Sequence, residues 1–447
     1  MGMSRNEVRQ RPPGRTVGGG PAPAAAAGAR RTEGARIAFV TEVWGWGGSE
    51  KYIANMVTGA IARGWQPHVF CPGQHPFITD PARALPSGCA VTPYAVDTSS
   101  ADTSPAPREA GRSSSIRPAI RRLYRKMVPG DLKLLAGAAG EARRMAALLR
   151  GGNFDIAYLG ITGCPHVALG IRRAVAGPFV GRFCIVPSDA PGGSSLAHRA
   201  LEWAALRCFD ELIANAVYAR ETWVRRTKLP PARFHVIYNG IDVNAFVPRR
   251  PAETVRAEIG VPAGCPVIGV TARLDLIKGH AYLLRAIPDV IRAVPDAHVV
   301  LAGEGRLRSV LERTAEELGI RERVHFLGNR TDVADVTQVY DVAVLPSVAG
   351  EGLPHTVLEA MALRKPMVAS RFSGIPEEVD DGVTGTLVPP GDAKALAEAI
   401  VDLLKDRDKA RAFGEAGRRR VEEKFTLQRM LDETFGLYEE MLAETRR

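Results

Sequence analysis

The chain has 447 residues, 45% of them hydrophobic and 24% charged, and a formal net charge of +10. This length suits two or three domains, and the composition is that of an ordinary globular protein, which excludes a wholly disordered chain. No run approaches the roughly 18 apolar residues that span a bilayer, which excludes an integral membrane protein. The six cysteines include no Cys-x-x-Cys pair, so a disulfide scaffold or zinc ribbon is not expected, and a reducing compartment fits.

The excess positive charge is concentrated in two segments. Residues 1–33 hold six arginines and two acids, and residues 101–150 hold eleven Lys and Arg and four acids. The first segment is rich in Gly, Ala and Pro without a Leu-rich core, so we expect a disordered tail and no signal peptide. A second low-complexity patch covers 97–115. A basic pI suggests a protein that binds nucleic acid. Because the excess charge is confined to a tail and one insertion, we expect no nucleic-acid partner.

Residues 117–133 have the pattern of a basic amphipathic helix. Ile120, Leu123, Tyr124 and Met127 repeat at helical spacing, with Arg and Lys between them. Such a helix can lie on an anionic membrane surface, and the alternative is a surface helix packed on the core. The membrane interpretation predicts a cytoplasmic protein that is peripheral on the inner face of the membrane.

From residue 36 onward, strand and helix patterns alternate. The first half predicts strands over 36–43, 68–71, 156–159, 179–183 and 211–214, with helices over 50–64 and 196–208. The second half predicts strands over 266–274, 297–303, 323–328, 341–347, 367–370 and 386–388, with helices over 306–319, 354–364 and 427–445. Residues 276–294 predict a turn with a glycine followed by a helix.

The apolar strands are near-continuous, as in parallel strands covered on both faces. The predicted fold class is therefore α/β, with two Rossmann-like, doubly wound sheets facing each other. We expect an N-terminal domain over 34–247, with an insertion at 97–133, and a C-terminal domain over 248–425. Ligands then belong in the cleft at the carboxyl ends of the strands.

The densest chemical signal is the segment 346–362, where a strand is followed by a Gly-rich loop and a helix. Glu351 lies in the loop, Pro354 marks the helix start, and Glu359 lies about one and a half turns into the helix. A helix N-terminus favours an anion or sugar oxygens, and two separated carboxylates can bind two pairs of hydroxyls. The alternative is a dipole-stabilised acid plus an exposed Glu.

Arg273 and Lys278 follow the first strand of the second half. A guanidinium fork and an ammonium group five residues apart suit a diphosphate, although an isolated pair of this kind would be a surface feature. The triplet Gly303-Glu304-Gly305 follows the next strand and allows the backbone to approach a ligand, but alone it is a weak signal.

The turn Gly45–Glu50 lacks the third glycine of a dinucleotide fingerprint. Its Gly47, Gly48 and Ser49 still lead into a helix N-terminus that can face a phosphate across the cleft. Trp44 and Trp46 could stack on a sugar, and a packed lid is the alternative.

Taken together, the segments ARLDLIKG, LAGEG, VHFLG, EGLPHTVLEAMA, SGIPEEVDDGVTGTLVPPGD and YNGID resemble the family 4 retaining glycosyltransferases of GT-B fold. The resemblance covers nearly all of 265–425 and reaches back to GGSE and NGID. It implies that the C-terminal domain binds a nucleotide-diphosphate sugar whose nucleotide is UDP or GDP. It also implies that the final helix, within 426–447, packs back on the N-terminal domain.

The resemblance also implies roles for individual residues. Arg273 and Lys278 would clamp the diphosphate, Glu351 would contact the donor sugar, and Glu359 would bind the ribose. Backbone amides around Gly352, Leu353 and Pro354 would support the sugar or phosphate, and Gly47 and Gly48 would approach the diphosphate from the other domain. The base pocket would be lined by segments near Gly303, Glu304, Gly305, Phe326 and Leu327.

Family members are typically metal-independent, and no Asp-x-Asp triplet ends a predicted strand, so no metal is expected. The family pattern implies front-face attack with the leaving phosphate taking the acceptor proton. One departure concerns Cys184, which stands where members often carry a His. Nearby His166 is the candidate replacement, although a lone His is more often structural.

These observations predict transfer of a hexose to a lipid-linked or polysaccharide acceptor. A nucleotide-sugar epimerase or hydrolase of the same fold is the alternative enzyme. A sugar-nucleotide-binding pseudoenzyme and a nucleic-acid binder are the non-enzymatic alternatives, and the motif set argues against the last of these.

Overall fold

The computed structural model describes residues 34–41, 48–94, 139–161, 165–183 and 196–445. The expected tail (1–33), the insertion 97–133 with its amphipathic helix, and the residues Trp44, Trp46, Gly47 and Cys184 lie outside the described residues. No helix in the described ranges has both the length and the apolar character needed to cross a membrane.

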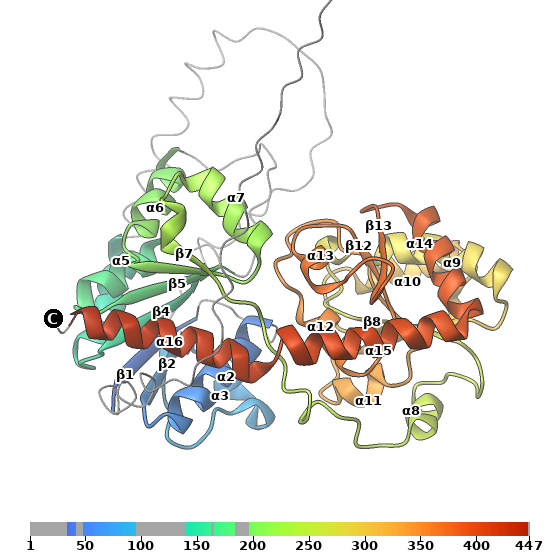
Figure 1. Ribbon diagram of the computed structural model, residues 1–447, viewed down its shortest axis with the longest axis horizontal. Helices are drawn as coiled ribbons and strands as arrows, with labels where there is room; N and C mark the ends of the chain where they lie inside the picture. Colours follow the sequence, from blue (N-terminus) through green and yellow to red (C-terminus); the bar gives the residue numbers. More distant parts are fainter. Residues whose placement is uncertain (1–33, 42–47, 95–138, 162–164, 184–195, 446–447) are drawn as a thin grey trace, which may run out of the picture.

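The first half of the chain forms one seven-stranded parallel sheet with helices on both faces (Figure 1). Its strands are β1 (Arg36–Val40), β2 (Gln66–Pro72), β3 (Ala90–Tyr94), β4 (Ile156–Ile161), β5 (Phe179–Phe183), β6 (Glu211–Ala214) and β7 (Phe234–Val236). Its helices are α2 (Gly48–Ala62), α3 (Pro76–Thr79), a helix over 139–150, α5 (Pro165–Ala174), α6 (Leu196–Leu206) and α7 (Val217–Thr227). The spatial order is β3-β2-β1-β4-β5-β6-β7.

The second half forms a six-stranded parallel sheet in the order β10-β9-β8-β11-β12-β13. Its strands are β8 (Val267–Thr271), β9 (His298–Ala302), β10 (Val324–Gly328), β11 (Val342–Leu345), β12 (Met367–Ser370) and β13 (Gly385–Val388). Its helices are α8 (Ala252–Glu258), α9 (His280–Ala293), α10 (Arg308–Glu317), α11 (Val333–Thr337), α12 (His355–Ala362), α13 (Ile375–Glu378), α14 (Ala393–Lys405) and α15 (Arg407–Lys424). The prediction of two doubly wound parallel sheets is confirmed.

Each sheet is covered by apolar clusters on both faces. The strands β5, β9, β11 and β12 are buried along their whole length, although β5 contains Arg182 and β9 begins with His298. The sequence pattern missed β3 and β7, which lie at the two edges of the first sheet. Edge strands are covered less completely, and the half-exposed sequence of β3, which includes Pro93, has no continuous apolar run.

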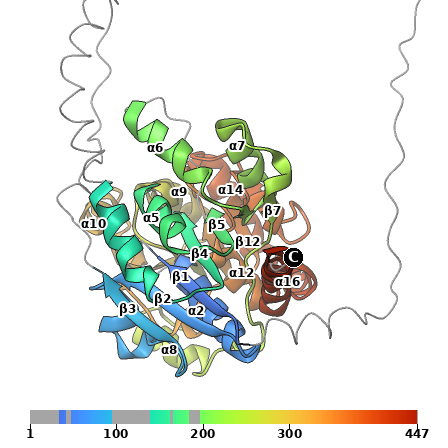
Figure 2. The same ribbon diagram turned by 90° about the vertical axis from the view of Figure 1, so that its left-hand side faces the viewer.

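The chain crosses twice between the two domains at one place. Ile241 N donates to Phe425 O at 2.9 Å, and Leu427 N donates to Ile241 O at 3.0 Å. After the second crossing, α16 (Leu427–Thr445) runs across the N-terminal domain (Figures 1 and 2). Its Leu431, Phe435 and Tyr438 lie in one buried cluster with side chains of α2 and β1.

Candidate functional site

The loop between β11 and α12 brings a carboxylate and an ammonium group together. Glu351 Oε1 accepts hydrogen bonds from Lys278 Nζ at 2.6 Å and from Ser347 Oγ at 2.6 Å. Glu351 is only 5% exposed, and Ser347 is fully buried. Lys278 follows β8, so the pair joins the loops after β8 and β11, where the strand order of the sheet reverses. This is the position at which doubly wound sheets bind ligands.

Glycine backbone geometry allows these two loops to meet. Lys278 ends a short 3-10 turn over Leu276–Lys278, and Gly279 follows in the left-handed region with φ 70°. A Cβ on Gly279 would lie 1.9 Å from the carbonyl oxygen of Pro346. The predicted turn with a glycine before the helix is confirmed, since the α-helix begins only at His280.

Arg273 lies in the loop that follows β8, five residues before Lys278. Its side chain is exposed and forms no ion pair with any residue in the described part of the chain. Its guanidinium is therefore available for an anionic ligand at the carboxyl end of β8.

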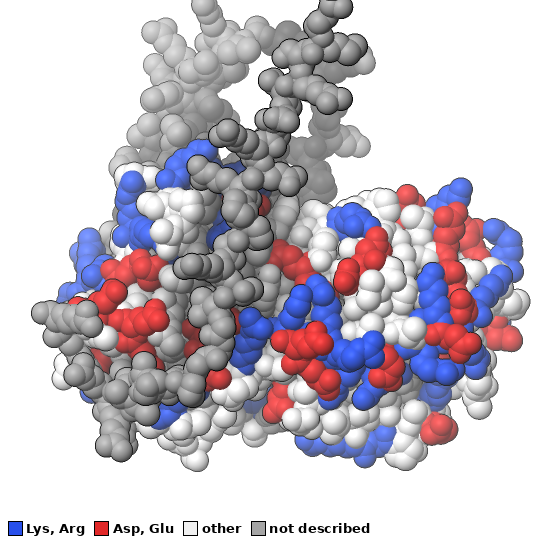
Figure 3. Space-filling view, in the orientation of Figure 1, with Lys and Arg blue, Asp and Glu red and all other residues white. Residues whose placement is uncertain are grey.

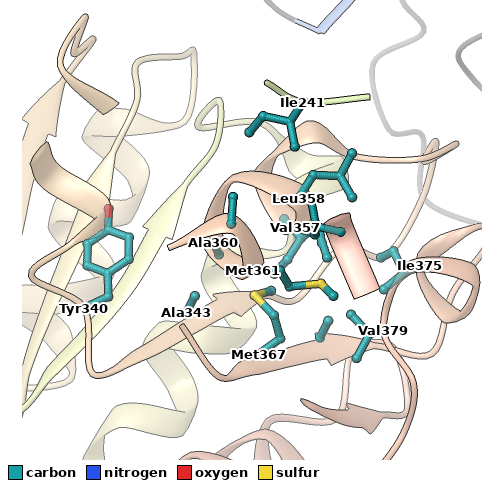
Figure 4. Packing of buried hydrophobic residues seen from close by; sticks show 14 of the residues in the cluster. Ile241, Tyr340, Ala343, Val357, Leu358, Ala360, Met361, Met367, Ile375 and Val379 are labelled. Atoms are coloured by element: carbon teal, nitrogen blue, oxygen red, sulfur yellow. The ribbon is translucent and has the colours of Figure 1, made fainter. Parts of the chain in front are cut away.

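The N-terminus of α12 opens into this site. Pro354 is the N-cap residue and offers no side-chain cap. Within the described residues no side chain bonds to the first backbone N–H groups, so those of His355 and Thr356 can bind an anion. Thr356 Oγ1 donates to Thr271 O at 2.8 Å, which fixes the helix to the end of β8. Its opposite face is packed by Leu358 and Met361 into a dense apolar cluster (Figure 4).

Glu359 is the second carboxylate of α12, and it meets the N-terminal domain. It is 5% exposed, and its Oε1 forms an ion pair with Lys51 Nζ of α2. Gly48, one turn before Lys51, lies against His355 of α12, such that a Cβ on Gly48 would be 3.0 Å from His355 Cδ2. The beginnings of α2 and α12 therefore contact each other across the cleft.

A buried polar chain connects the N-terminal sheet to the same loop. Arg182 of β5 is fully buried, lies 3.4 Å from the centroid of the Tyr52 ring and donates to Asn239 Oδ1 at 2.7 Å. Asn239 Nδ2 in turn donates to the carbonyl oxygen of Leu353. A hydrogen-bonded bridge thus runs from one domain through the linker to the loop that carries Glu351.

Two titratable groups border the site, the half-buried His355 and the fully buried Glu378. Burial, with the nearby charges of Lys51 and Arg182, lowers the pKa of His355 to about 3, so its imidazole is neutral. Burial, with the charge of Glu351, raises the pKa of Glu378 well above its usual value. The Glu378 carboxyl is fully buried, and no described residue bonds to either of its oxygens.

These groups suit a ligand with a compact anionic part and a hydroxyl-rich part. Arg273, Lys278 and the N-terminus of α12 supply positive charge and N–H donors, while Glu351 and Glu359 supply hydroxyl acceptors.

Comparison with known proteins identifies the family. A model described as "Glycosyl transferases group 1" matches residues 251–420, and one described as "Glycosyltransferase Family 4" matches residues 46–245. The α-maltose-1-phosphate synthase of Mycolicibacterium smegmatis is 34% identical over an alignment that covers 56% of this chain and 68% of that enzyme. The chain belongs to the family 4 glycosyltransferases.

Other relatives of this glycosyltransferase match over shorter parts of their length. The GDP-mannose-dependent monoacylated alpha-(1-6)-phosphatidylinositol monomannoside mannosyltransferase of Corynebacterium glutamicum is 33% identical, over 44% of this chain and about half (54%) of that enzyme. Among solved structures, sucrose-phosphate synthase from Thermosynechococcus elongatus has a TM-score of 0.72 at 22% identity, covering 92% of this chain and 100% of that one. Anabaena HepE in complex with UDP-glucose has a TM-score of 0.69 at 21% identity, covering 92% and 98%. These structures share the two-domain fold.

The triplet Gly303-Glu304-Gly305, which follows β9, forms a tightly packed turn. A Cβ on Gly303 would lie 2.0 Å from Ala272 O, and one on Gly305 would lie 2.4 Å from Leu274 O. Both glycines therefore pack against the loop that carries Arg273. Glu304 is engaged by Arg308, with Nη1 to Oε2 at 2.8 Å, on a partly exposed surface.

The remaining predicted residues lie in three places. Phe326 and Leu327 of β10 are partly buried against the two apolar clusters of the second sheet. Ser49 lies in the first turn of α2. His166 lies in the first turn of α5, and its side chain is outside the described part of the structure.

Sequence reasoning missed Lys51, Arg182, Ser347 and His355. His355 and Ser347 stand inside the segment that was singled out, but their sequence positions do not reveal burial. Lys51 is 308 positions from Glu359, and Arg182 is 57 from Asn239, so only the folded arrangement shows these contacts.

Proposed function

We propose that this glycosyltransferase transfers a hexose from a nucleoside-diphosphate sugar to a lipid-linked or polysaccharide acceptor, with retention of configuration at the anomeric carbon. The observation that carries the proposal is the pairing of Lys278 with Glu351 beside the uncapped N-terminus of α12. The pairing supports the proposal because an ammonium group that could neutralise phosphate charge and a carboxylate that could accept sugar hydroxyls lie within one hydrogen bond of each other.

In this proposal Arg273 and Lys278 bind the diphosphate, and the first N–H groups of α12 add the partial positive charge of the helix dipole. Glu351 accepts hydrogen bonds from donor-sugar hydroxyls, and Glu359 accepts those of the ribose. The acceptor oxygen bonds to the anomeric carbon on the face that the phosphate leaves. The bond from that carbon to the phosphate oxygen breaks, and the phosphate takes the acceptor proton.

The printed names of the relatives support the substrate classes. One relative is GDP-mannose-dependent and is named for a phosphatidylinositol monomannoside, and a solved neighbour was crystallised with UDP-glucose. We therefore propose UDP or GDP as the donor nucleotide and a lipid-linked or glycan acceptor. Donor binding is proposed to need no metal, because the cations of the site are side chains.

Product analysis tests this proposal. Radiolabelled nucleotide sugar is incubated with and without candidate lipid and glycan acceptors, and the products are separated. Transfer of label to an acceptor, with retained configuration by NMR, is expected. A changed sugar nucleotide without acceptor would favour the epimerase, free sugar the hydrolase, and bound but unconverted donor the pseudoenzyme.

Two associated proposals concern partners. We propose peripheral attachment to the cytoplasmic membrane face through residues 117–133, so deleting them should abolish binding to anionic liposomes; unchanged binding would contradict it. No nucleic-acid partner is proposed, and basic and acidic side chains are interspersed over the face of the C-terminal domain in Figure 3.

A further inference from the structure

Lys51 is a cation of the N-terminal domain that reaches into the C-terminal domain. Its Nζ forms an ion pair with Glu359 Oε1, and the two side chains are 32% and 7% exposed. The carboxylate is thus enclosed, while about a third of the lysine side chain remains exposed to solvent.

The meeting of two helix faces directs Lys51 to this position. Gly48 and Lys51 are three residues apart on α2, and His355 and Glu359 are four apart on α12, so each pair shares a helix face. Gly48 packs against His355, and Lys51 pairs with Glu359. The absence of a Cβ at Gly48 allows the close approach that brings Lys51 within reach of the opposite domain.

The charge balance of the site shows what Lys51 adds. Glu351 and Glu359 carry two negative charges, and Arg273 and Lys278 carry two positive charges, so these four groups are neutral together. His355 adds no charge, because its imidazole is held neutral. Lys51 adds a positive charge to these groups, as does Arg182, whose charge also acts on His355, and a net positive charge attracts a diphosphate.

The ammonium group of Lys51 has more hydrogen-bond donors than the ion pair with Glu359 requires. It carries three N–H bonds, and one of them suffices for Glu359. The others can reach an anion in the cleft without breaking the ion pair, and Glu359 would hold the ammonium in place.

We propose that Lys51 is a donor-binding residue supplied by the N-terminal domain, which contacts the diphosphate of the nucleotide sugar while Glu359 orients it. This inference rests on the proposed function of the site. Because the contact spans the cleft, the diphosphate site is complete only when the two domains are together, and the donor stabilises that arrangement.

The test compares a charged with an uncharged ligand. Lys51→Met should weaken binding of the nucleoside diphosphate (UDP or GDP) by about 10- to 100-fold in calorimetry, the loss typical of one charged hydrogen bond. Binding of the matching nucleoside, followed by ligand-observed NMR, should change by less than about 3-fold. Lys51→Arg, which keeps the charge, should retain most diphosphate affinity. Lys394→Met is the matched control, because it removes an exposed lysine paired with Glu398 far along the chain on α14.

Three outcomes would overturn the inference. Unchanged diphosphate affinity in Lys51→Met would exclude the contact. Equal losses of affinity for the diphosphate and the nucleoside would mean that Lys51 only orients Glu359. An equal loss in Lys394→Met would mean that the total charge of the protein determines the affinity. Lys51→Met leaves the buried Glu359 unpaired and could unfold the protein. In that case the double variant Lys51→Met/Glu359→Gln is compared with Glu359→Gln alone, and the same loss of diphosphate affinity is expected. Failure of the wild-type protein to bind any nucleoside diphosphate would instead refute the proposed function.

Discussion

Glu377 of the C-terminal domain caps a helix of the N-terminal domain. Its Oε2 accepts a hydrogen bond from Val217 N at 2.8 Å, and its Oε1 accepts one from Tyr218 N at 2.9 Å. The N-cap residue of α7, Ala216, makes no side-chain cap of its own. The preceding Ser373 donates to the carbonyl oxygen of Glu351. One short segment therefore links the loop between β11 and α12 to α7.

We predict that Glu377→Ala weakens both folding and donor use. Loss of a helix N-cap costs on the order of 0.5–2 kcal/mol in the free energy of unfolding, and loss of this one also releases the contact between domains. The KM for the donor should therefore rise several-fold in steady-state assays. Asp392→Ala is the control, because Asp392 caps α14 within one domain through Ala395 N at 2.9 Å. Equal donor KM values in the two variants would contradict the linkage.

Glu351→Gln and Lys278→Met should each lower kcat/KM by about 10²- to 10³-fold, as expected for groups that stabilise charge or orient the reacting sugar. The control is Glu398→Gln, whose exposed carboxylate pairs with Lys394 on α14. This control should retain activity within about 3-fold. An equal loss in this control would show that the effect is not specific to the site.

Glu378 should make stability depend on pH. Its pKa is raised in the folded protein, so the folded protein holds a proton that the unfolded chain releases above pH 4.5. The stability of the wild type should then fall as pH rises from 4.5 toward the folded pKa, by about 1.4 kcal/mol per pH unit in this range. Glu378→Gln removes the titrating carboxyl. The melting temperature of this variant, relative to that of the wild type, should therefore increase as pH rises. Parallel curves would mean that Glu378 is ionised in the fold.

Gly48→Val should impair closure of the cleft. A Cβ there already lies 3.0 Å from His355, and the branched side chain needs further room. Donor KM should rise with little change in melting temperature. Gly436→Ala is the control, because no atom lies within 4 Å of its Cβ position in α16, and the helix should gain up to about 1 kcal/mol. Unchanged donor KM in Gly48→Val would show that α2 and α12 do not approach during the reaction.

The sequence allowed the proximity of the loops after β8 and β11 to be predicted, but not the contacts between the two domains. Glu351 and Lys278 each follow an apolar strand, and parallel strands bring such loops to one edge, so their neighbourhood was foreseeable. Glu378 stands among four acids in EEVDD and suggests a solvated surface, yet packing of α13 buries it completely. The contacts of Lys51 and Glu377 depend on the relative placement of the two sheets, which no local pattern encodes.

We propose a nucleoside-diphosphate site in the C-terminal domain that needs no metal. Thermal unfolding in EDTA with UDP, GDP and ADP, and with their common sugars, tests this proposal. A ligand at 100 times its Kd adds about 2.7 kcal/mol of stability, which raises the melting temperature by several degrees. We predict such a rise with one nucleotide family, and its loss in Lys278→Met. No rise with any nucleotide in folded protein, or a rise that requires a divalent metal, would contradict the account.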